Sequence, residues 1–543
     1  MAGPGFTRSA RIPPNRRRRL AALAAAGLAI ALAAPAAAQV EVHSLTAPDL
    51  FSFGGASDLP SDVWAGSSGA LYKAVVPQVG TKPMSPAVAA LARRLIAAAA
   101  PGPQGVGSDP DVAGVRALAM LSLGDAADVE AITDRTPGLP QHPGLSQAAA
   151  EAALLRGEED KACAIGDALT VGREGLYWLK LRAYCQARSG QAAAAQLTLD
   201  LAQRLLRMPD FERLMDALLK AKDGGAPALD NGLDYALSRR VSANWAQGLD
   251  AAPPAVAVAI ARDPKTPPAA RIAAAARAAR LGMAAADAYS AVSPVPPDLA
   301  AADVPGPAGE AGLVALSQTA SDWSLKERAV IAVLRRAKDG PEFLAMSRLT
   351  APSIAQLVGA HAVLREPVLF AMAAAAAGDA PSARAARSLV GQGTPSPPAI
   401  DLALLDALIA AVSDPIPDSA SARLQALQTQ VDAIGRARAV AAIALLGALG
   451  APTGPDARFA IAASDLGPSR IPPGSLLALD LGAKAGRMGD VGLYVVLMAS
   501  ESGVSGLSVA DRAALIRALD RTRLKADARA FAVEGLLALQ ARP

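Results

Sequence analysis

The sequence predicts an all-α fold, a helical-repeat superhelix of short stacked helices behind a partly irregular N-terminal lead. Of the 543 residues, 52% are hydrophobic but only 3% are aromatic, so the apolar residues are mainly small and aliphatic. Apolar stretches with helical spacing alternate with turns that carry Gly, Pro or Asp. No stretch alternates apolar and polar residues with a period of two, so we expect no sheet. Alanine favours helices yet buries little area, which suits thin layers of helices.

Residues 1–38 have the pattern of a signal peptide. Residues 16–19 are four arginines, residues 20–34 are apolar but short for a membrane span, and three alanines follow Pro35. We expect cleavage after Ala38 and export to the periplasm; the alternative is an uncleaved anchor helix. No later apolar stretch has the length of a transmembrane helix.

The charge of the chain excludes some partners. Six of its 53 basic residues, but none of its 49 acidic residues, lie in 1–38. Without that segment, 47 basic residues face 49 acidic ones, a net charge of −2. A near-neutral chain lacks the basic excess typical of proteins that bind nucleic acid or anionic lipid.

Residues 39–85 form the partly irregular lead. We expect one short helix over 61–76, capped by Ser61, with Trp64 packed inward. The lead also carries Phe51, Phe53 and Tyr72. These aromatic side chains either seal the first helices of the array, which we favour, or form a docking segment for a partner.

Residues 86–543 form the expected array of helices. Ser85-Pro86 and Asp109-Pro110 are typical helix starts, because proline in the first turn loses no hydrogen bond. Helices of about 10–15 residues imply a count near twenty. We interpret the proline-rich breaks at 293–307, 391–398 and 467–473 as loops within one array. We expect four helices over 474–540, the last of which, 524–540, would be a polar-faced cap.

Pairs of adjacent prolines predict five further helix starts. Each pair stands just before an apolar run: Pro253-Pro254, Pro267-Pro268, Pro296-Pro297, Pro397-Pro398 and Pro472-Pro473.

A recurring glycine followed by a polar residue predicts a turn between paired helices. Glycine ends one helix in the left-handed conformation, and the polar residue starts the next. The five instances are Gly124-Asp125, Gly157-Glu158, Gly190-Gln191, Gly378-Asp379 and Gly489-Asp490.

The stretch 176–209 resembles a tetratricopeptide repeat. Six residues match the large, small and turn positions of that motif: Leu179, Ala183, Gly190, Ala195, Leu199 and Ala202. The match is poor elsewhere: around Gly378, Arg387 stands at the position of Leu199. The resemblance implies a helical-repeat superhelix whose usual work is binding peptides or proteins, and it carries over no binding residues.

The two cysteines are expected to form a disulfide. Cys163 lies in a predicted helix over 159–171, and Cys185 lies in the next one, over 173–188. Each cysteine is about 11 residues, or roughly 16 Å, from the turn between these helices, so an antiparallel pair places them at the same level. Export provides the oxidising compartment. The alternative is two unrelated buried thiols; without a C-x-x-C motif or a nearby histidine, we expect no catalytic cysteine.

The search for catalytic chemistry gives one weak candidate. His43, His142 and His361 are far apart and match no zinc motif, and the glycine-rich stretch 102–107 follows no strand. Glu501-Ser502-Gly503 is similar to the catalytic pair of lytic transglycosylases, but Ser508-Val509 departs from that family's pattern. We therefore expect no enzyme activity, no cofactor and no metal site, and interpret Glu501 as a loop residue.

Other charged and aromatic groups are expected to be structural. We interpret Glu158-Glu159-Asp160-Lys161 as a solvated helix start. We likewise place the arginine pairs 93–94 and 335–336 on solvated faces. The densest aromatic residues are expected in the core, although such side chains are also favoured at interfaces: Tyr177, Trp178, Tyr184 and Trp245.

Three functions remain open. The favoured hypothesis is a periplasmic scaffold or adaptor that binds a protein or peptide partner in the cell envelope, without catalysis. The second is a cell-wall enzyme or its accessory. The third is a structural envelope protein that acts by self-association.

Overall fold

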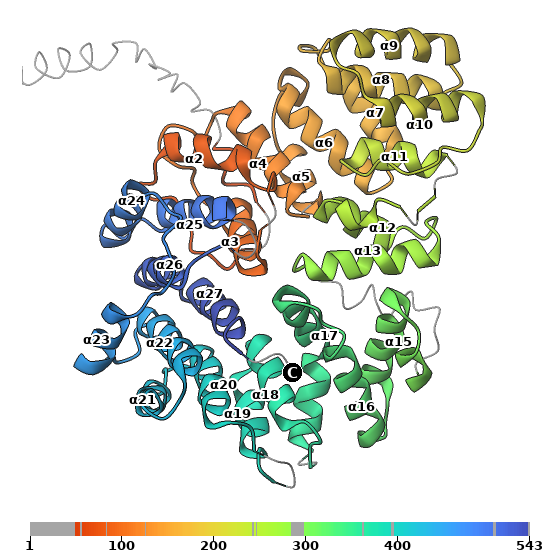
Figure 1. The fold of residues 1–543 in the computed structure, drawn as a ribbon. Coiled ribbons are helices and arrows are strands. Elements are labelled where there is room, and N and C mark those ends of the chain that lie inside the picture. The colour runs from red at the N-terminus through yellow and green to blue at the C-terminus, as the bar shows by residue number, and fades with distance from the viewer. Residues whose placement is uncertain are drawn as a thin grey trace, which may run out of the picture. The chain divides into compact units, whose positions relative to one another are not determined.

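Helix follows helix through the whole described part of the chain (Figure 1). The computed structural model describes residues 49–54, 57–82, 84–124, 126–241, 244–245, 247–283, 298–360, 363–392, 396–502 and 506–540. Within these ranges the fold is all-α, with 25 α-helices, short 3₁₀ turns and no strand. The predicted signal peptide of residues 1–38 and the Pro296-Pro297 helix start lie outside the described residues.

The first half of the array contains twelve described helices. They are α2 (Gly69–Val75), α3 (Pro86–Ala97), α4 (Pro110–Ser122), α5 (Ala126–Thr133), α6 (Pro143–Leu155), α7 (Glu159–Ala168), α8 (Leu176–Arg188), α9 (Ala192–Leu205), α10 (Pro209–Lys220), α11 (Gly232–Arg240), α12 (Pro254–Arg262) and α13 (Pro268–Arg280).

The second half contains thirteen described helices. They are α15 (Gly306–Thr319), α16 (Trp323–Leu334), α17 (Gly340–Gly359), α18 (Pro367–Ala376), α19 (Ala380–Ser388), α20 (Ala399–Ala411), α21 (Asp418–Leu427), α22 (Ala433–Ala448), α23 (Pro455–Ala463), α24 (Pro473–Lys484), α25 (Met488–Ser502), α26 (Val509–Arg521) and α27 (Lys525–Leu537).

Local sequence signals explain where most of these helices begin. The Ser85 hydroxyl accepts a hydrogen bond from the Val88 amide at the start of α3, and Asp109 caps α4 in the same way. The described proline pairs stand at the starts of α12, α13, α20 and α24, as predicted. The described chain from Asp49 onward forms one compact unit.

The helix expected over 61–76 begins later than predicted. Residues 61–66 form turns, and α2 begins only at Gly69, where the Ser68 hydroxyl accepts from the Leu71 amide. Trp64 is buried as predicted, and its ring meets Tyr72 edge-on at 5.3 Å. Phe51 is also fully buried against Tyr72, so these aromatic side chains are part of the core rather than an exposed docking segment.

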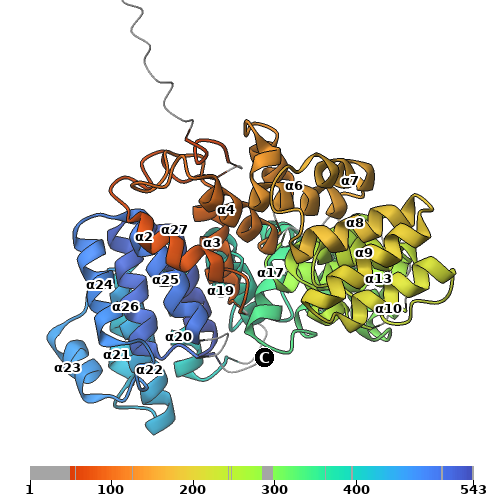
Figure 2. The ribbon, with the colours of Figure 1, turned by 90° about the horizontal axis from the view of Figure 1, so that it is seen from above.

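The lead and the first helix of the array also pack against the last helices of the described chain. Both α2 and α3 contact α25, and Figures 1 and 2 show them side by side. The Gly489 amide donates to the Val63 carbonyl, and the Ser68 amide donates to the Asp490 carboxylate at 2.9 Å. Segments more than 400 residues apart in sequence are therefore joined by specific hydrogen bonds.

Four of the five predicted glycine turns are correct. Gly124, Gly157, Gly190 and Gly378 all have positive φ, as a left-handed helix end requires. The fifth is wrong: Gly489 lies inside α25, and the turn before that helix uses Gly486, with φ of 67°.

The last helix is not a cap. The four helices expected over 474–540 are present, but α27 packs against α3, α20, α22 and α26. It buries Phe531 completely and Asp527 almost completely. The expectation of a polar outer face failed because the start of the chain covers the helix that an open array would leave at its end.

Candidate functional site

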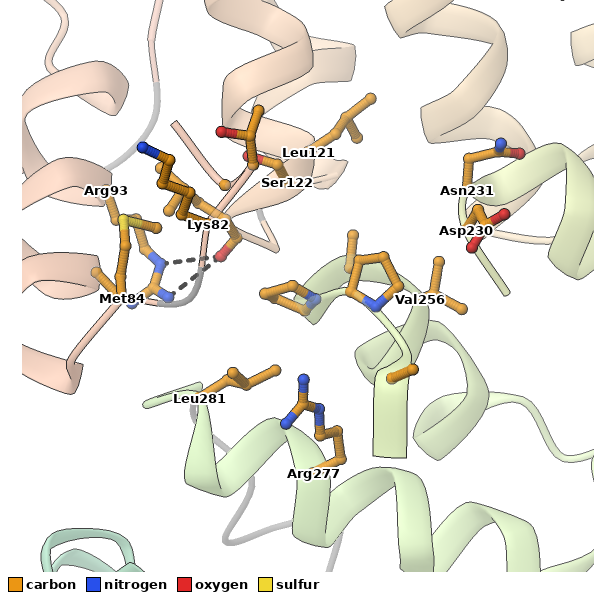
Figure 3. Close-up of a pocket in the computed structure, with 18 of the residues that line it drawn as sticks. Lys82, Met84, Arg93, Leu121, Ser122, Asp230, Asn231, Val256, Arg277 and Leu281 are labelled. Atoms are coloured by element: carbon orange, nitrogen blue, oxygen red, sulfur yellow. Dashed lines mark hydrogen bonds between the residues drawn. The ribbon is translucent and has the colours of Figure 1, made fainter. Parts of the chain in front are cut away.

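A pocket of about 710 Å³ opens between the early and middle helices of the array (Figure 3). Its walls come from residues 80–82 and Met84, from α3, α4, α6, α8, α12 and α13, and from the starts of α11 and α17. This volume lies in the range of known small-molecule and peptide-sized sites. The pocket is therefore the natural candidate for a binding site.

One wall of the pocket is acidic and contains a buried carboxylate. Glu151 of α6 is 5% exposed, and its Oε2 accepts from the Gly232 amide at 2.5 Å. The Tyr177 hydroxyl lies beside this carboxylate and interacts with it. Asp230 and Asn231 continue this wall.

Burial controls the protonation of this acidic wall. It raises the pKa of Glu151 to about 7, opposed in part by the Tyr177 hydroxyl and the Gly232 amide. Burial, together with the charge of Glu151, also raises the pKa of Tyr177. Near neutral pH, Glu151 can thus exist with or without its proton.

The facing walls carry basic side chains, together with Asp339 and Glu342 near the start of α17, where Glu342 pairs with Arg280 at 2.9 Å. Figure 3 shows Lys82 and Arg93 across the pocket from Asp230, with the Arg277 guanidinium below them. Arg93 Nε and Nη2 donate to the Leu123 carbonyl, each at 3.2 Å. Arg277 Nε donates to the Ala252 carbonyl, and burial lowers the pKa of Arg277. These bonds to main-chain carbonyls fix the guanidinium groups at the pocket wall.

Apolar groups separate the two charged sides. Leu121 of α4, Val256 of α12 and Leu281 lie between them (Figure 3), and Pro253 and Pro254 also line the pocket. Charged groups of both signs around an apolar middle suit a ligand that itself carries separated charges and an apolar part. The arrangement is suited to binding and orienting such a ligand.

The cysteines are placed as predicted, away from this pocket. Cys163 of α7 and Cys185 of α8 form a disulfide, with their Cα atoms 5.8 Å apart. The bond joins two helices that are also adjacent in the contact pattern, so it stabilises the local hairpin.

The remaining candidates from the sequence do not gather into one site. Glu501 is exposed near the end of α25, and Gly503 lies outside the described residues. His142 precedes α6, whereas His43 and His361 lie outside the described residues. Within those ranges, no group of three or more His, Cys, Asp or Glu side chains is arranged to hold a metal ion.

The aromatic residues divide between core and pocket. Trp178 and Tyr184 are buried, whereas Tyr177 and Trp245 are half-buried. Tyr177 is the one of these four that lines the pocket. Tyr177 therefore lies at the pocket wall, whereas Trp178 and Tyr184 lie in the core.

The expectation of a solvated helix start at residues 158–161 is wrong for Glu159. This side chain is 5% exposed and accepts hydrogen bonds from Tyr184 at 2.7 Å and from Arg240 at 2.6 Å. Although burial opposes it, these bonds and that of Arg239 hold the pKa of Glu159 below its ordinary value. The arginines come from α11, about 80 residues away, which no local pattern could reveal.

Both arginine pairs also depart from the expected solvated faces. Arg94 of α3 pairs with the buried Asp527 of α27. Arg336 donates to the carbonyls of Ala302 and Val304, at 2.9 and 2.7 Å, and so holds the loop before α15. Only Arg335 is exposed, paired with Glu366 at 2.6 Å.

Glu151 was missed by sequence reasoning, although a signal exists. It is the one acid in the run Ala148-Ala149-Ala150-Glu151-Ala152-Ala153, whose spacing indicates a helix buried on most sides. Burying a single acidic side chain among alanines costs free energy unless the carboxyl group has a hydrogen-bond or charge partner. This pattern alone does not show which other helix packs against Glu151.

Comparison with known protein families, with curated proteins and with solved structures found no match. None of the helices in the described part of the chain combines the length and apolar character that crossing a membrane requires.

Proposed function

We propose that this chain is an exported, non-catalytic scaffold of the cell envelope that binds a segment of a protein partner in the mixed-charge pocket. The carrying observation is the pairing of charges across the pocket, which has the buried Glu151 carboxylate on one wall and the Lys82 and Arg277 side chains on the facing walls. A ligand with separated charges can pair with both sides at once.

A polypeptide segment suits the rest of the pocket. Its main chain supplies N–H donors, its side chains supply both charges, and the apolar groups around Val256 accept aliphatic side chains. Peptide binding is also the usual work of the tetratricopeptide family that residues 176–209 resemble. The disulfide is compatible with an oxidising compartment, which supports export.

The structure offers less support for a cell-wall enzyme. A glutamate that acts as a general acid needs an enclosed apolar environment to keep its proton near neutral pH. Glu501 is exposed, so its surroundings do not provide that environment. Binding without catalysis is therefore the function that we propose.

Selection of short random-sequence peptides against the chain without residues 1–38, followed by fluorescence anisotropy, tests this proposal. We expect the selected peptides to carry both basic and acidic groups. Glu151→Gln and Arg277→Gln should each weaken their binding about tenfold, as expected for losing one charged hydrogen bond.

The matched control is Arg458→Gln, at an exposed arginine of α23 that does not line the pocket. It should leave binding unchanged. Failure to enrich any peptide, or equal affinity for all variants, contradicts the proposal.

A further inference from the structure

Helix α9 carries a row of leucines on the side that faces solvent. Leu197, Leu201 and Leu205 follow one another at intervals of four and are 64%, 44% and 59% exposed. Leu206, directly after the helix, is 56% exposed. We name these four residues the α9 stripe. Exposed leucines that line up on one helix face mark an interaction surface more often than scattered ones do.

The opposite side of α9 accounts for its packing within the chain. Ala195, Leu199 and Ala202 are buried, and α8 is the helix against which they pack (Figure 1). The disulfide in turn ties α8 to α7. The α9 stripe is thus presented on a rigid support and is not needed for the contact with α8.

The charges beside the stripe are self-complementary. Asp200 and Arg204 are exposed and lie one turn apart, in the row next to Leu201 and Leu205. When two copies of a helix pack antiparallel about a two-fold axis, the same flank of each helix meets its counterpart in reverse order. Asp200 of one copy then lies within about 3 Å, along the helix axis, of the level of Arg204 in the other.

We propose that the α9 stripe is a self-association surface, on which a second copy of this chain packs its own α9 in antiparallel orientation. Leu201 meets its counterpart at the two-fold axis, and Leu197 meets Leu205 on either side. Two symmetric pairs between Asp200 and Arg204 fix the orientation, as flanking charges do in coiled coils. This surface is separate from the pocket, so the inference does not depend on the proposed function.

The area of the α9 stripe determines the affinity that we expect for the dimer. A stable interface buries about 800 Å² on each partner, which one helix of 14 residues supplies only in part. We therefore expect a reversible dimer with a Kd on the order of micromolar.

Analytical ultracentrifugation of the chain without residues 1–38, over about 1–100 µM, measures this association. We expect Leu201→Asp to abolish the dimer. Leu477→Asp, at a leucine of α24 that is 59% exposed, is the matched control and should leave the dimer intact. A wild-type chain that stays monomeric over the whole range overturns the proposal.

Charge reversal tests the antiparallel orientation. Asp200→Arg and Arg204→Asp each place like charges opposite one another and should each weaken the dimer at least about tenfold. An equimolar mixture of the two variants restores opposite charges at both pairs, so it should form a heterodimer with nearly wild-type affinity. Single variants that dimerise with wild-type affinity, or a mixture that associates no more tightly than the single variants, overturn the proposal, and circular dichroism confirms that each variant is folded.

Discussion

The carboxyl group of Glu151 is buried, and burial favours the neutral, protonated form of this group. Its pKa is about 7 in the folded chain, against an ordinary value of 4.5. Between these two values the folded state keeps a proton that the unfolded state has lost. Its contribution to stability is therefore fully present below pH 4.5 and is lost as the pH rises through 7.

We predict that Glu151→Gln removes this dependence on pH. The wild type should lose up to about 3 kcal/mol of stability between pH 4.5 and 8 through this group, and the variant should lose correspondingly less. Urea denaturation at both ends of this range measures the difference. The same substitution at the exposed Glu501 is the control and should follow the wild type. If the stability of the wild type and that of Glu151→Gln changed equally with pH, Glu151 would not be the group with the raised pKa.

Helix α25 approaches the N-terminal lead through a glycine. A Cβ atom on Gly489 would lie 2.5 Å from the Trp64 ring and 2.6 Å from the Ser67 hydroxyl. Because Trp64 is buried and its ring is rigid, the neighbours cannot move aside at low cost. We predict that Gly489→Ala lowers the free energy of unfolding by about 1–3 kcal/mol, measured by chemical denaturation.

Gly474 provides the control for this helix contact. It also lies in a helix, α24, and a Cβ atom there meets no atom within 4 Å. Gly474→Ala should leave stability unchanged or raise it slightly, because alanine favours the helix. Equal effects of both substitutions would show that the contact with Trp64 does not matter.

Gly489 also marks the limit of sequence-based prediction for single elements. Capping serines, aspartates and prolines act within one turn, so the starts of α3, α4 and α12 follow from local sequence. The glycine-plus-aspartate pattern at Gly489 is the same as at Gly124, yet it lies within a helix. The turn lies three residues earlier instead, at Gly486, and Gly489 packs against Trp64, 425 positions away, a contact that no local pattern reports. Local patterns likewise did not predict the pocket, because its walls come from helices that are far apart in the chain.

The two ends of the described array contact each other, which the open superhelix expected from the sequence does not predict. Arg94 of α3 pairs with Asp527 of α27, and the Ala87 amide donates to Glu534 at 2.7 Å. In an open repeat array, stability is a sum over nearest neighbours in sequence, and terminal helices fray. Here α3 and α27 are neighbours in space, so each should depend on the other.

We predict that a mild core substitution in α27 loosens α3. Phe531 is fully buried on the face that carries Asp527 and Glu534, so Phe531→Leu should cost about 1–2 kcal/mol and speed amide hydrogen exchange across α3 roughly tenfold. Phe211→Leu in α10 is the control, since Phe211 belongs to a separate buried cluster with residues of α8 and α11. It should speed exchange in those helices and leave α3 unchanged. If Phe531→Leu speeds amide exchange only in α20, α22 and α26 and not in α3, the contact between the two ends contributes no stability. The array then behaves as an open one.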